Sequence, residues 1–451
     1  MVYLIAFIAA MAGFLFGFDE GIIGGVLERI IEEFGLKHYH VGLMMGLLPL
    51  SALVTAFCTG KISDRFGRRP ILFLISLGFL IACIAIYVHP SFIVLCISRI
   101  LFGATIGMSV VVAPMYIAET APKEIRGKLV IFFQLAITLG ILSSYSIQLF
   151  FPLASHWSGI FLTGLVPGGI FLIGCFFIPE SPRWLFLKNR VSDAHAVLYQ
   201  IYGKKFHPKE IESELGSIKN ILTHNKHQGV FRELFSKKGL PCLLLGVMLF
   251  LFQQSSGINA VIYFAPAIFQ SMQLGDRQVI LLATVGIGLI NTLSTFLSFP
   301  LVERVGRRTL LMLGFAGATI FLICIAIFAQ LQGPIFQLCA AISIFLYISS
   351  FAIGIGPVPF ILISEVFPLK IRGQGMSFAA ASNWMFNSIV VAIFPTLLLW
   401  YGISYTFLIY GVCCALGFLY TLRFVPETKG LSLEEIEQHI RSGKSLRSIG
   451  S

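Results

Sequence analysis

Two charged side chains lie inside stretches of sequence that are otherwise almost wholly apolar. Asp19 stands in the run 13–25, whose only other ionisable residue is Glu20. Arg99 is the only basic residue well inside an apolar stretch. Charged residues are costly in hydrocarbon, so those retained there usually mark ion or proton pathways or pair with one another. The chemistry that these residue types favour is reversible binding of a proton inside a membrane.

A second group of polar side chains occupies the apolar stretch that begins near residue 239. Gln254, Asn259 and Tyr263 are spaced five and four residues apart, which places them near one face of a helix. Gln253 is adjacent to Gln254, so at most one of the two points squarely at a central cavity. The alternative for any single amide, which we apply to Gln253 and Asn387, is an interhelical hydrogen bond worth about 0.6 kcal/mol. That alternative explains the whole set poorly.

The composition indicates a protein whose surface faces lipid. Of the 451 residues, 57% are hydrophobic and only 12% are charged, whereas soluble proteins average about 25% charged residues. The net charge of +11 lies in loops between apolar stretches, so membrane topology explains it better than nucleic acid binding does. Neither a nucleotide-binding loop nor a nucleophile motif is present, which disfavours an enzyme or an ATP-driven pump. No metal or other cofactor is expected.

Twelve apolar stretches are long enough to span a bilayer, which takes about 20 residues. Their lack of alternation excludes a barrel, so the sequence predicts an all-α membrane protein. The predicted spans are 2–25, 41–62, 70–88, 92–115, 128–151, 157–178, 239–272, 277–302, 309–331, 335–365, 374–400 and 403–425.

The distribution of Lys and Arg predicts the orientation of these spans. The loops after spans 2, 4, 8 and 10 are rich in basic residues, whereas the opposite side carries only Arg29, Lys37 and Arg277. By the positive-inside rule the basic side is cytoplasmic, and both termini lie there. We expect a multi-pass protein of the cell membrane, the inner membrane if the source is bacterial, and we expect it to act as a monomer.

Three short motifs occur twice, once in each half of the chain. They follow the second, fourth and sixth predicted spans of each half, which indicates two parallel six-span halves with substrate bound near the midplane where they meet. The pairs are Asp64–Arg69 with Glu303–Arg308, Glu119–Gly127 with Glu365–Gly373, and Pro179–Glu180 with Pro426–Glu427.

The repeat and the polar segments divide the chain into four parts. Residues 208–216 have the composition of a helix, and residues 432–440 predict a short amphipathic helix. The predicted parts are an amino-terminal six-helix half at 1–180, a cytoplasmic helical insert at 181–238, a carboxy-terminal six-helix half at 239–426 and a cytoplasmic tail at 427–451.

The charges in the repeated motifs predict a gate on the cytoplasmic side. In this hypothesis Glu119 faces Arg372 and Arg126 faces Glu365, and these ties break when that side opens. The alternative is that the motifs serve only as topology signals, which accounts for the arginines but not for the acidic residues. The candidate gate residues are Asp64, Arg65, Arg68, Glu119, Arg126, Glu180, Arg183, Glu303, Arg304, Arg307, Glu365, Arg372 and Glu427.

With these repeats, the chain resembles the sugar porter family of the major facilitator superfamily, and bacterial sugar–proton symporters within it. The resemblance extends from about residue 12 to residue 430 and implies twelve spans in two pseudo-symmetric halves joined by a cytoplasmic helical insert. The motifs that carry it are Gly60–Arg69, Pro179–Trp184, Gln253–Asn259, Gly356–Phe360 and Pro426–Gly430.

The resemblance implies a site for a monosaccharide, a hexose or a pentose. Amides and hydroxyls both donate and accept hydrogen bonds, as sugar hydroxyls require, and aromatic side chains suit the sugar ring. Phe360 stands where many members have Trp, and Ile141 stands where several proton-coupled members have a polar residue. The implied substrate-binding residues are Gln134, Gln253, Gln254, Asn259, Tyr263, Asn291, Phe360, Asn383, Trp384 and Asn387.

The resemblance also pairs Asp19 with Arg99. We expect that protonation of Asp19 releases Arg99 and permits the rocking step. Proton-coupled members have Asp at this position and facilitators commonly have an uncharged residue, so Asp19 favours symport. Glu20 points roughly 100° away around the helix, either toward an outer vestibule or toward a shared proton. The alternatives to symport are a passive sugar facilitator in which the pair is structural, a polyol or inositol carrier, and a non-transporting sugar sensor.

Overall fold

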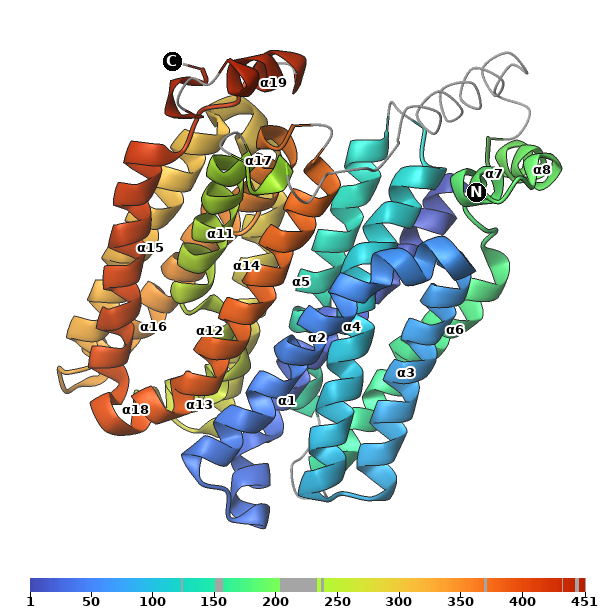
Figure 1. Cartoon of the computed structure of the whole chain (residues 1–451). Helices are drawn as coiled ribbons and strands as arrows, with labels where there is room; N and C mark the ends of the chain where they lie inside the picture. Colours follow the sequence, from blue (N-terminus) through green and yellow to red (C-terminus); the bar gives the residue numbers. More distant parts are fainter. Residues whose placement is uncertain are drawn as a thin grey trace. The chain divides into compact units, whose positions relative to one another are not determined.

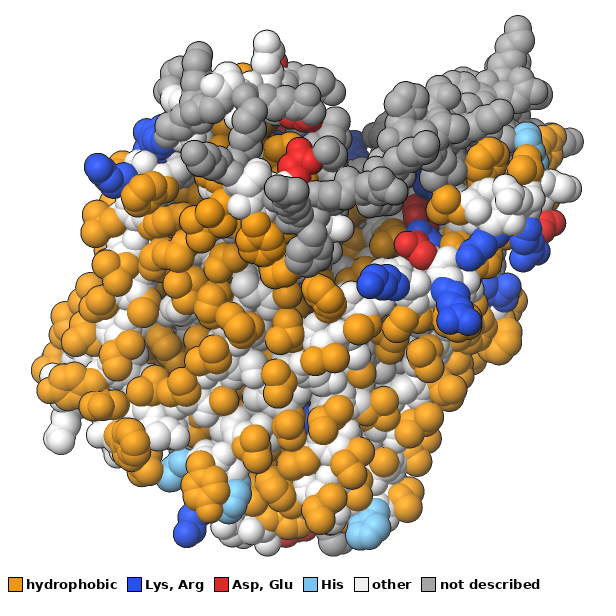
Figure 2. Space-filling model, in the orientation of Figure 1, with side chains coloured by type: hydrophobic (Ala, Val, Ile, Leu, Met, Phe, Trp, Pro, Cys, Tyr) orange, Lys and Arg blue, Asp and Glu red, His pale blue; other side chains and the backbone are white. Residues whose placement is uncertain are grey.

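The apolar stretches form helices, as hydrocarbon requires of chains that must satisfy their own backbone hydrogen bonds. In the computed structural model long helices dominate the chain, and no strand occurs among the described residues (Figure 1). Hydrophobic side chains cover most of the face in Figure 2. Many large hydrophobic residues of the described chain are exposed, Val166 and Phe296 among them. The structure describes residues 1–122, 125–150, 157–202, 233–236, 239–368, 371–431, 433–442 and 446–450.

The first six predicted spans are each found as helix. The sixth span begins as a 3₁₀ segment, η1 (Trp157–Gly164), and continues as α6 (Leu165–Phe177). The others are α1 (Val2–Phe34), α2 (His38–Phe66), α3 (Arg68–Val88), α4 (Phe92–Thr120) and α5 (Arg126–Phe150).

The later spans are less regular than the sequence predicts. The tenth passes through a π-helical segment, η3 (Phe351–Ile355), where an extra residue per turn locally widens the helix. The helices of this part are α11 (Gly239–Ser255), α12 (Ile258–Tyr263), α13 (Ala265–Ser271), α14 (Arg277–Val305), α15 (Arg307–Phe328), α16 (Pro334–Ser350), α17 (Val358–Val366) and α18 (Arg372–Phe424).

The twelve-span layout is confirmed, although only eleven helical stretches of the described chain are long and apolar enough to cross a membrane. The 53-residue α18 contains both remaining spans. Its helix is interrupted at Gly402, whose φ of 69° lies in the left-handed region. Glycine adopts that conformation without steric cost. The chain can therefore turn there between the spans predicted at 374–400 and 403–425.

The seventh span is broken, which corrects the prediction of one continuous helix over 239–272. Gly257 has a φ of 84° and separates α11 from α12, and a second interruption at Phe264 separates α12 from α13. The spacing of Gln254, Asn259 and Tyr263 therefore cannot place them on one face of one helix. Their relation is decided by the contacts described below.

Two compact units are defined by contacts within the chain. The first contains Met1–Asp19 and Leu50–Ile141, and the second contains Glu20–Pro49, the end of α5 from Leu142, and the carboxy-terminal spans. The boundaries therefore fall inside α1, α2 and α5. Grouping by contact differs from the sequence repeat, so the boundaries predicted at 180, 238 and 426 stay predictions.

Parts of the polar segments are described. α7 (Pro182–Leu187) and α8 (Val191–Tyr202) form the start of the predicted insert, whereas the helix predicted at 208–216 lies outside the described residues. The amphipathic helix predicted in the tail is confirmed as α19 (Leu433–Arg441), which buries Ile436 and Ile440.

In the first unit α1 and α5 approach each other at glycines. A Cβ added to Gly17 would lie 1.8 Å from the carbonyl oxygen of Ile137. We expect Gly17→Ala to force the backbones apart and to reduce the free energy of unfolding by about 1–3 kcal/mol, measured by thermal unfolding in detergent. Gly60→Ala is the control, because no atom lies within 4 Å of a Cβ there. Equal stability of the two variants would contradict the close approach.

Candidate functional site

The predicted pairing of Asp19 with Arg99 is confirmed in the first unit. Nη1 of Arg99, on α4, donates a hydrogen bond of 2.8 Å to Oδ2 of Asp19, on α1. The two side chains are 0% and 1% exposed. Oδ1 of Asp19 has no hydrogen-bond partner among the described residues. Arg99 thus donates to one carboxylate oxygen of Asp19 and not to the other.

Glu20 follows Asp19 on α1 but belongs to the second unit, and it is buried as well. Its side chain is 3% exposed, and the hydroxyl of Tyr263, on α12, donates a hydrogen bond of 3.3 Å to Oε1. In this structure Glu20 therefore does not lie exposed in an outer vestibule. Whether Glu20 shares the proton of Asp19 stays a hypothesis.

Four amides form a connected network in the second unit. Asn383, on α18, donates to Oε1 of Gln253 at 2.6 Å and accepts from Nε2 of Gln254 at 3.2 Å. Asn259, on α12, donates to Oε1 of Gln254 at 2.8 Å. The network spans the break at Gly257, so Gln254 and Asn259 remain together although the helix between them is interrupted.

Gln253 has a structural role that the sequence analysis allowed for it. Its Nε2 donates to the carbonyl oxygens of Ile355 and Gly356 at 2.8 and 2.9 Å, where the π segment ends. These bonds tie α11 to the irregular part of the tenth span. Asn383 forms hydrogen bonds with both glutamines. The two side chains therefore belong to one network, although the sequence predicted that at most one of them points at a central cavity.

The remaining predicted binding residues differ in their surroundings. Asn387 is 2% exposed, and its Oδ1 has no hydrogen-bond partner among the described residues, so the alternative of an interhelical hydrogen bond stays open only for its amide nitrogen. Phe360 is exposed and makes an edge contact with Phe250, with ring centroids 4.8 Å apart. Gln134 is exposed on α5 in the first unit. Asn291 on α14, Trp384 on α18 and Tyr263 on α12 are all buried.

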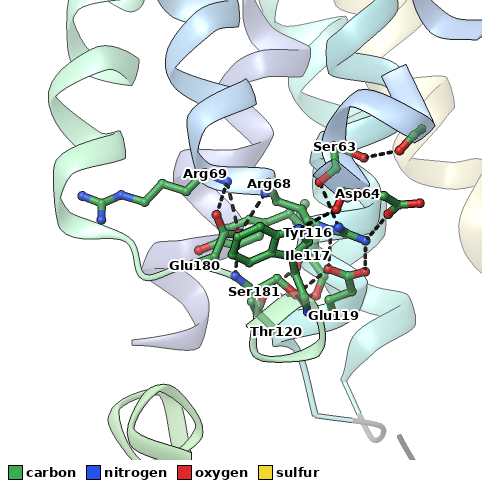
Figure 3. A network of polar contacts seen from close by, with 12 residues as sticks. Ser63, Asp64, Arg68, Arg69, Tyr116, Ile117, Glu119, Thr120, Glu180 and Ser181 are labelled. Atoms are coloured by element: carbon green, nitrogen blue, oxygen red, sulfur yellow. Dashed lines mark hydrogen bonds and ion pairs between the residues drawn. The ribbon is translucent and has the colours of Figure 1, made fainter. Parts of the chain in front are cut away.

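The charged motifs of the first unit form one network at the start of α3 (Figure 3). Arg68 donates through Nε and Nη2 to the two carboxylate oxygens of Glu119, both at 2.9 Å, and also pairs with Asp64 at 3.2 Å. Ser181 donates its hydroxyl to Glu119. A forked arginine–carboxylate pair of this kind fixes both the distance and the orientation of its elements.

Glu180 caps the start of α3. Its carboxylate accepts from the backbone N–H groups of Arg68, Arg69 and Ser181 at 2.9, 3.2 and 2.7 Å (Figure 3). Unpaired N–H groups at a helix start attract anions. Burial raises the pKa of Glu180 from its ordinary value, and the backbone hydrogen bonds lower it again in part.

The second unit repeats both arrangements at α15. Glu427 accepts from the backbone N–H groups of Arg307 and Arg308 at 3.0 and 3.1 Å. Arg307 also pairs with Glu365 at 2.9 Å, and Thr428 donates to Glu365. The sequence repeat is thus a structural repeat. Ser181 and Thr428 were missed by the sequence analysis, although each follows the repeated Pro–Glu pair.

Two of the gate arginines donate to backbone carbonyl oxygens a few residues away. Arg126 donates to the carbonyl oxygen of Ala121 at 3.4 Å, and Arg372 donates to that of Phe367 at 3.1 Å. The predicted ties of Glu119 to Arg372 and of Arg126 to Glu365 stay predictions. Among the other gate candidates Arg183 is half-buried, and Arg65, Glu303 and Arg304 are exposed.

The network predicts a strict requirement for arginine at position 68. Arg68→Lys keeps the charge but cannot form the fork to Glu119. Hydrogen bonds to charged groups contribute about 1.5–3 kcal/mol, so we expect a loss of about that size in the free energy of unfolding, measured by thermal unfolding in detergent. The matched control is Arg65→Lys, because Arg65 is exposed and has no ion pair among the described residues. Unchanged stability in Arg68→Lys would refute the importance of the fork.

The fold and these sites define a class of protein. A bundle of apolar helices with a buried ion pair, a buried amide network and a charge network repeated at the span ends is typical of a secondary transporter of the major facilitator type. The model of the family described as "Sugar (and other) transporter" matches residues 5–440, and the chain belongs to this family.

Several of the proteins to which the chain is similar are sugar transporters. The galactose-proton symporter of Escherichia coli (strain K12) is 35% identical over 455 residues, which cover 100% of this chain and 97% of that protein. The D-xylose-proton symporter of the same strain is 33% identical, over 97% of this chain and 95% of that protein. The solved inward-open conformation of the xylose transporter XylE from E. coli is 30% identical, with a TM-score of 0.83 over 97% of this chain and 99% of that one. The chain is therefore a sugar transporter and not an enzyme.

Proposed function

We propose that this protein imports a monosaccharide together with a proton by alternating access, with Asp19 as the coupling carboxylate. The observation that carries the proposal is the buried Asp19–Arg99 pair, in which Arg99 holds Oδ2 and leaves Oδ1 without a hydrogen-bond partner among the described residues. A proton added to Oδ1 neutralises the carboxylate, weakens its attraction to Arg99 and frees α1 to move relative to α4. Similarity to galactose-proton and xylose-proton symporters supports this assignment.

The amide network is the proposed contact surface for the sugar hydroxyls. Gln254 and Asn259 can exchange their mutual hydrogen bond for bonds to a hydroxyl, and Oδ1 of Asn387 provides a buried acceptor with no partner among the described residues. Trp384, also buried on α18, is the proposed aromatic surface for the sugar ring. Such a combination of convergent amides and an aromatic side chain suits a polar ring compound.

The direction and the membrane placement are part of the same proposal. The basic loops put the ends of α2 and α4, and both termini, on the cytoplasmic side. Import then requires that substrate enters from the side where α1 ends at Phe34 and leaves on the side of the Arg68 and Arg307 networks.

The test is sugar-dependent alkalinisation of the external medium by de-energised cells that express the protein. A panel of labelled hexoses, pentoses and polyols, each with and without an imposed proton gradient, identifies the substrate in the same experiment. We expect the medium to become alkaline as sugar enters, and an uncoupler to collapse accumulation. Sugar influx without proton movement would overturn symport in favour of the passive facilitator.

A further inference from the structure

A short stretch of α1 directly after Asp19 is held tightly in the second unit. Nε2 of Gln148, on α5, donates to the carbonyl oxygen of Gly21 at 2.9 Å. A Cβ added to Gly24 would lie 2.6 Å from the carbonyl oxygen of Tyr263, on α12. The backbone of α1 therefore touches both α5 and α12 here, and only glycine permits the approach to α12.

α12 depends on its neighbours for its position. It has only six residues between the interruptions at Gly257 and Phe264, and so short a helix has little stability of its own. Two tyrosine hydroxyls hold it. Tyr145, on α5, donates to the carbonyl oxygen of Ile262 at 2.6 Å, and Tyr263 donates to Glu20 at 3.3 Å.

The two adjacent carboxylates of α1 therefore have partners in different units. Asp19 is the last residue of its segment in the first unit and pairs with Arg99, whereas Glu20 is the first residue of its segment in the second unit and accepts from Tyr263. Because the two residues share one helical turn, a rotation or shift of α1 at Asp19 also displaces the carboxylate of Glu20. At 3.3 Å the bond is longer than the roughly 2.5–3.0 Å that is usual between two oxygens, and a weak contact of this kind suits one that opens during each cycle.

We propose that Glu20 is a positioning residue that latches α12 to α1 through the hydroxyl of Tyr263, and that release of Asp19 from Arg99 is transmitted to α12 through this latch. The latch itself is a property of the second unit, and its part in transport rests on the proposed function. It gives the carboxylate next to Asp19 a role distinct from proton binding.

The first test is hydrogen–deuterium exchange of the peptide covering 258–263 in the purified full-length protein. Glu20→Ala and Tyr263→Phe each remove one side of the same contact. A single ordinary hydrogen bond slows local opening by at most about tenfold, so each variant should exchange several-fold faster than the parent, up to about tenfold. The double variant should be no faster than either single one. The latch would be overturned if the rate increases of the two single variants multiplied in the double variant, or if Glu20→Ala left the exchange rate unchanged.

Two further variants separate the latch from a general loosening of the fold. Glu20→Gln keeps an acceptor oxygen, so α12 should exchange at nearly the parental rate and sugar uptake should stay close to parental. Glu28→Ala is the matched control, because Glu28 also lies on α1 and accepts from Gln270 of α13 at 2.8 Å. It should leave exchange at 258–263 unchanged. Faster exchange with Glu28→Ala, or failure of Gln to replace Glu20, would show that the contact does not act as proposed.

Transport assays on the same variants keep the two proposals distinguishable. If Glu20 and Tyr263 act together in exchange but the parent moves no proton with sugar, the latch stands and symport fails. If the parent is a symporter but Glu20 and Tyr263 act independently, symport stands and the latch fails.

Discussion

Cells that express Asp19→Asn are expected to lose sugar accumulation against a gradient, down to passive equilibration, while exchange of labelled for unlabelled sugar continues. The amide cannot take up the proton, so net uptake is no longer driven by the proton gradient. Arg99 can still donate a hydrogen bond to the amide oxygen, so this contact between α1 and α4 is kept, although the buried charge of Arg99 is no longer compensated. The measurement is accumulation of labelled sugar in energised cells, with counterflow in de-energised cells as the second readout.

The control for this result is Asp193→Asn. Asp193 pairs with Arg190 at 2.7 Å on the exposed surface of α8, where the two side chains are 50% and 57% exposed. Removing that charge should leave both accumulation and exchange unchanged. Accumulation by Asp19→Asn at the level of the parent would contradict the role of Asp19 in coupling, whereas loss of exchange as well would indicate that Asp19 is needed for the rocking step itself.

The second large effect is expected for Arg99→Leu, which leaves the carboxylate of Asp19 buried without its partner. Breaking a buried ion pair by removing one member typically costs about 3–5 kcal/mol. The same penalty should be relieved in the double variant Asp19→Asn with Arg99→Leu, because no buried charge then remains at this position. Thermal unfolding in detergent measures both variants against the parent.

An exposed ion pair provides the comparison for Arg99→Leu. Arg190→Leu removes the partner of Asp193 at the surface, where pairs contribute no more than about 1 kcal/mol. We therefore expect a small shift for Arg190→Leu and a large one for Arg99→Leu. Similar shifts, or a double variant at Asp19 and Arg99 that is no more stable than Arg99→Leu alone, would mean that the pair is not a strongly coupled buried unit.

The repeated charge networks illustrate where inference from motifs stops. The motifs correctly indicated two copies of one arrangement, and Glu180 and Glu427 indeed occupy equivalent positions at the starts of α3 and α15. The spacing did not reveal which acidic residue pairs with which arginine. Arg68 reaches Glu119 only because the start of α3 lies close to the end of α4, and that arrangement is a property of the folded unit.

The sequence by itself determined the class of fold, the number of spans and the location of the buried charges. These are local properties. Each span needs about 20 apolar residues, so a charged residue within such a stretch can be seen in the sequence alone. Asp19 and Arg99 could therefore be recognised without a structure. The duplicated motifs determined the repeat in the same way, because they can be compared along the chain alone.

Only the tertiary structure decided which polar side chains form hydrogen bonds with one another. The break at Gly257 interrupts the spacing that related Gln254 to Asn259, yet Asn383 and the amides themselves restore their contact. Likewise the helical position of Glu20 did not indicate Tyr263 as its partner. A buried polar group needs a hydrogen-bond partner close to it. Which partner is close depends on how helices far apart in the sequence bend and pack, and residue spacing within one helix does not determine this.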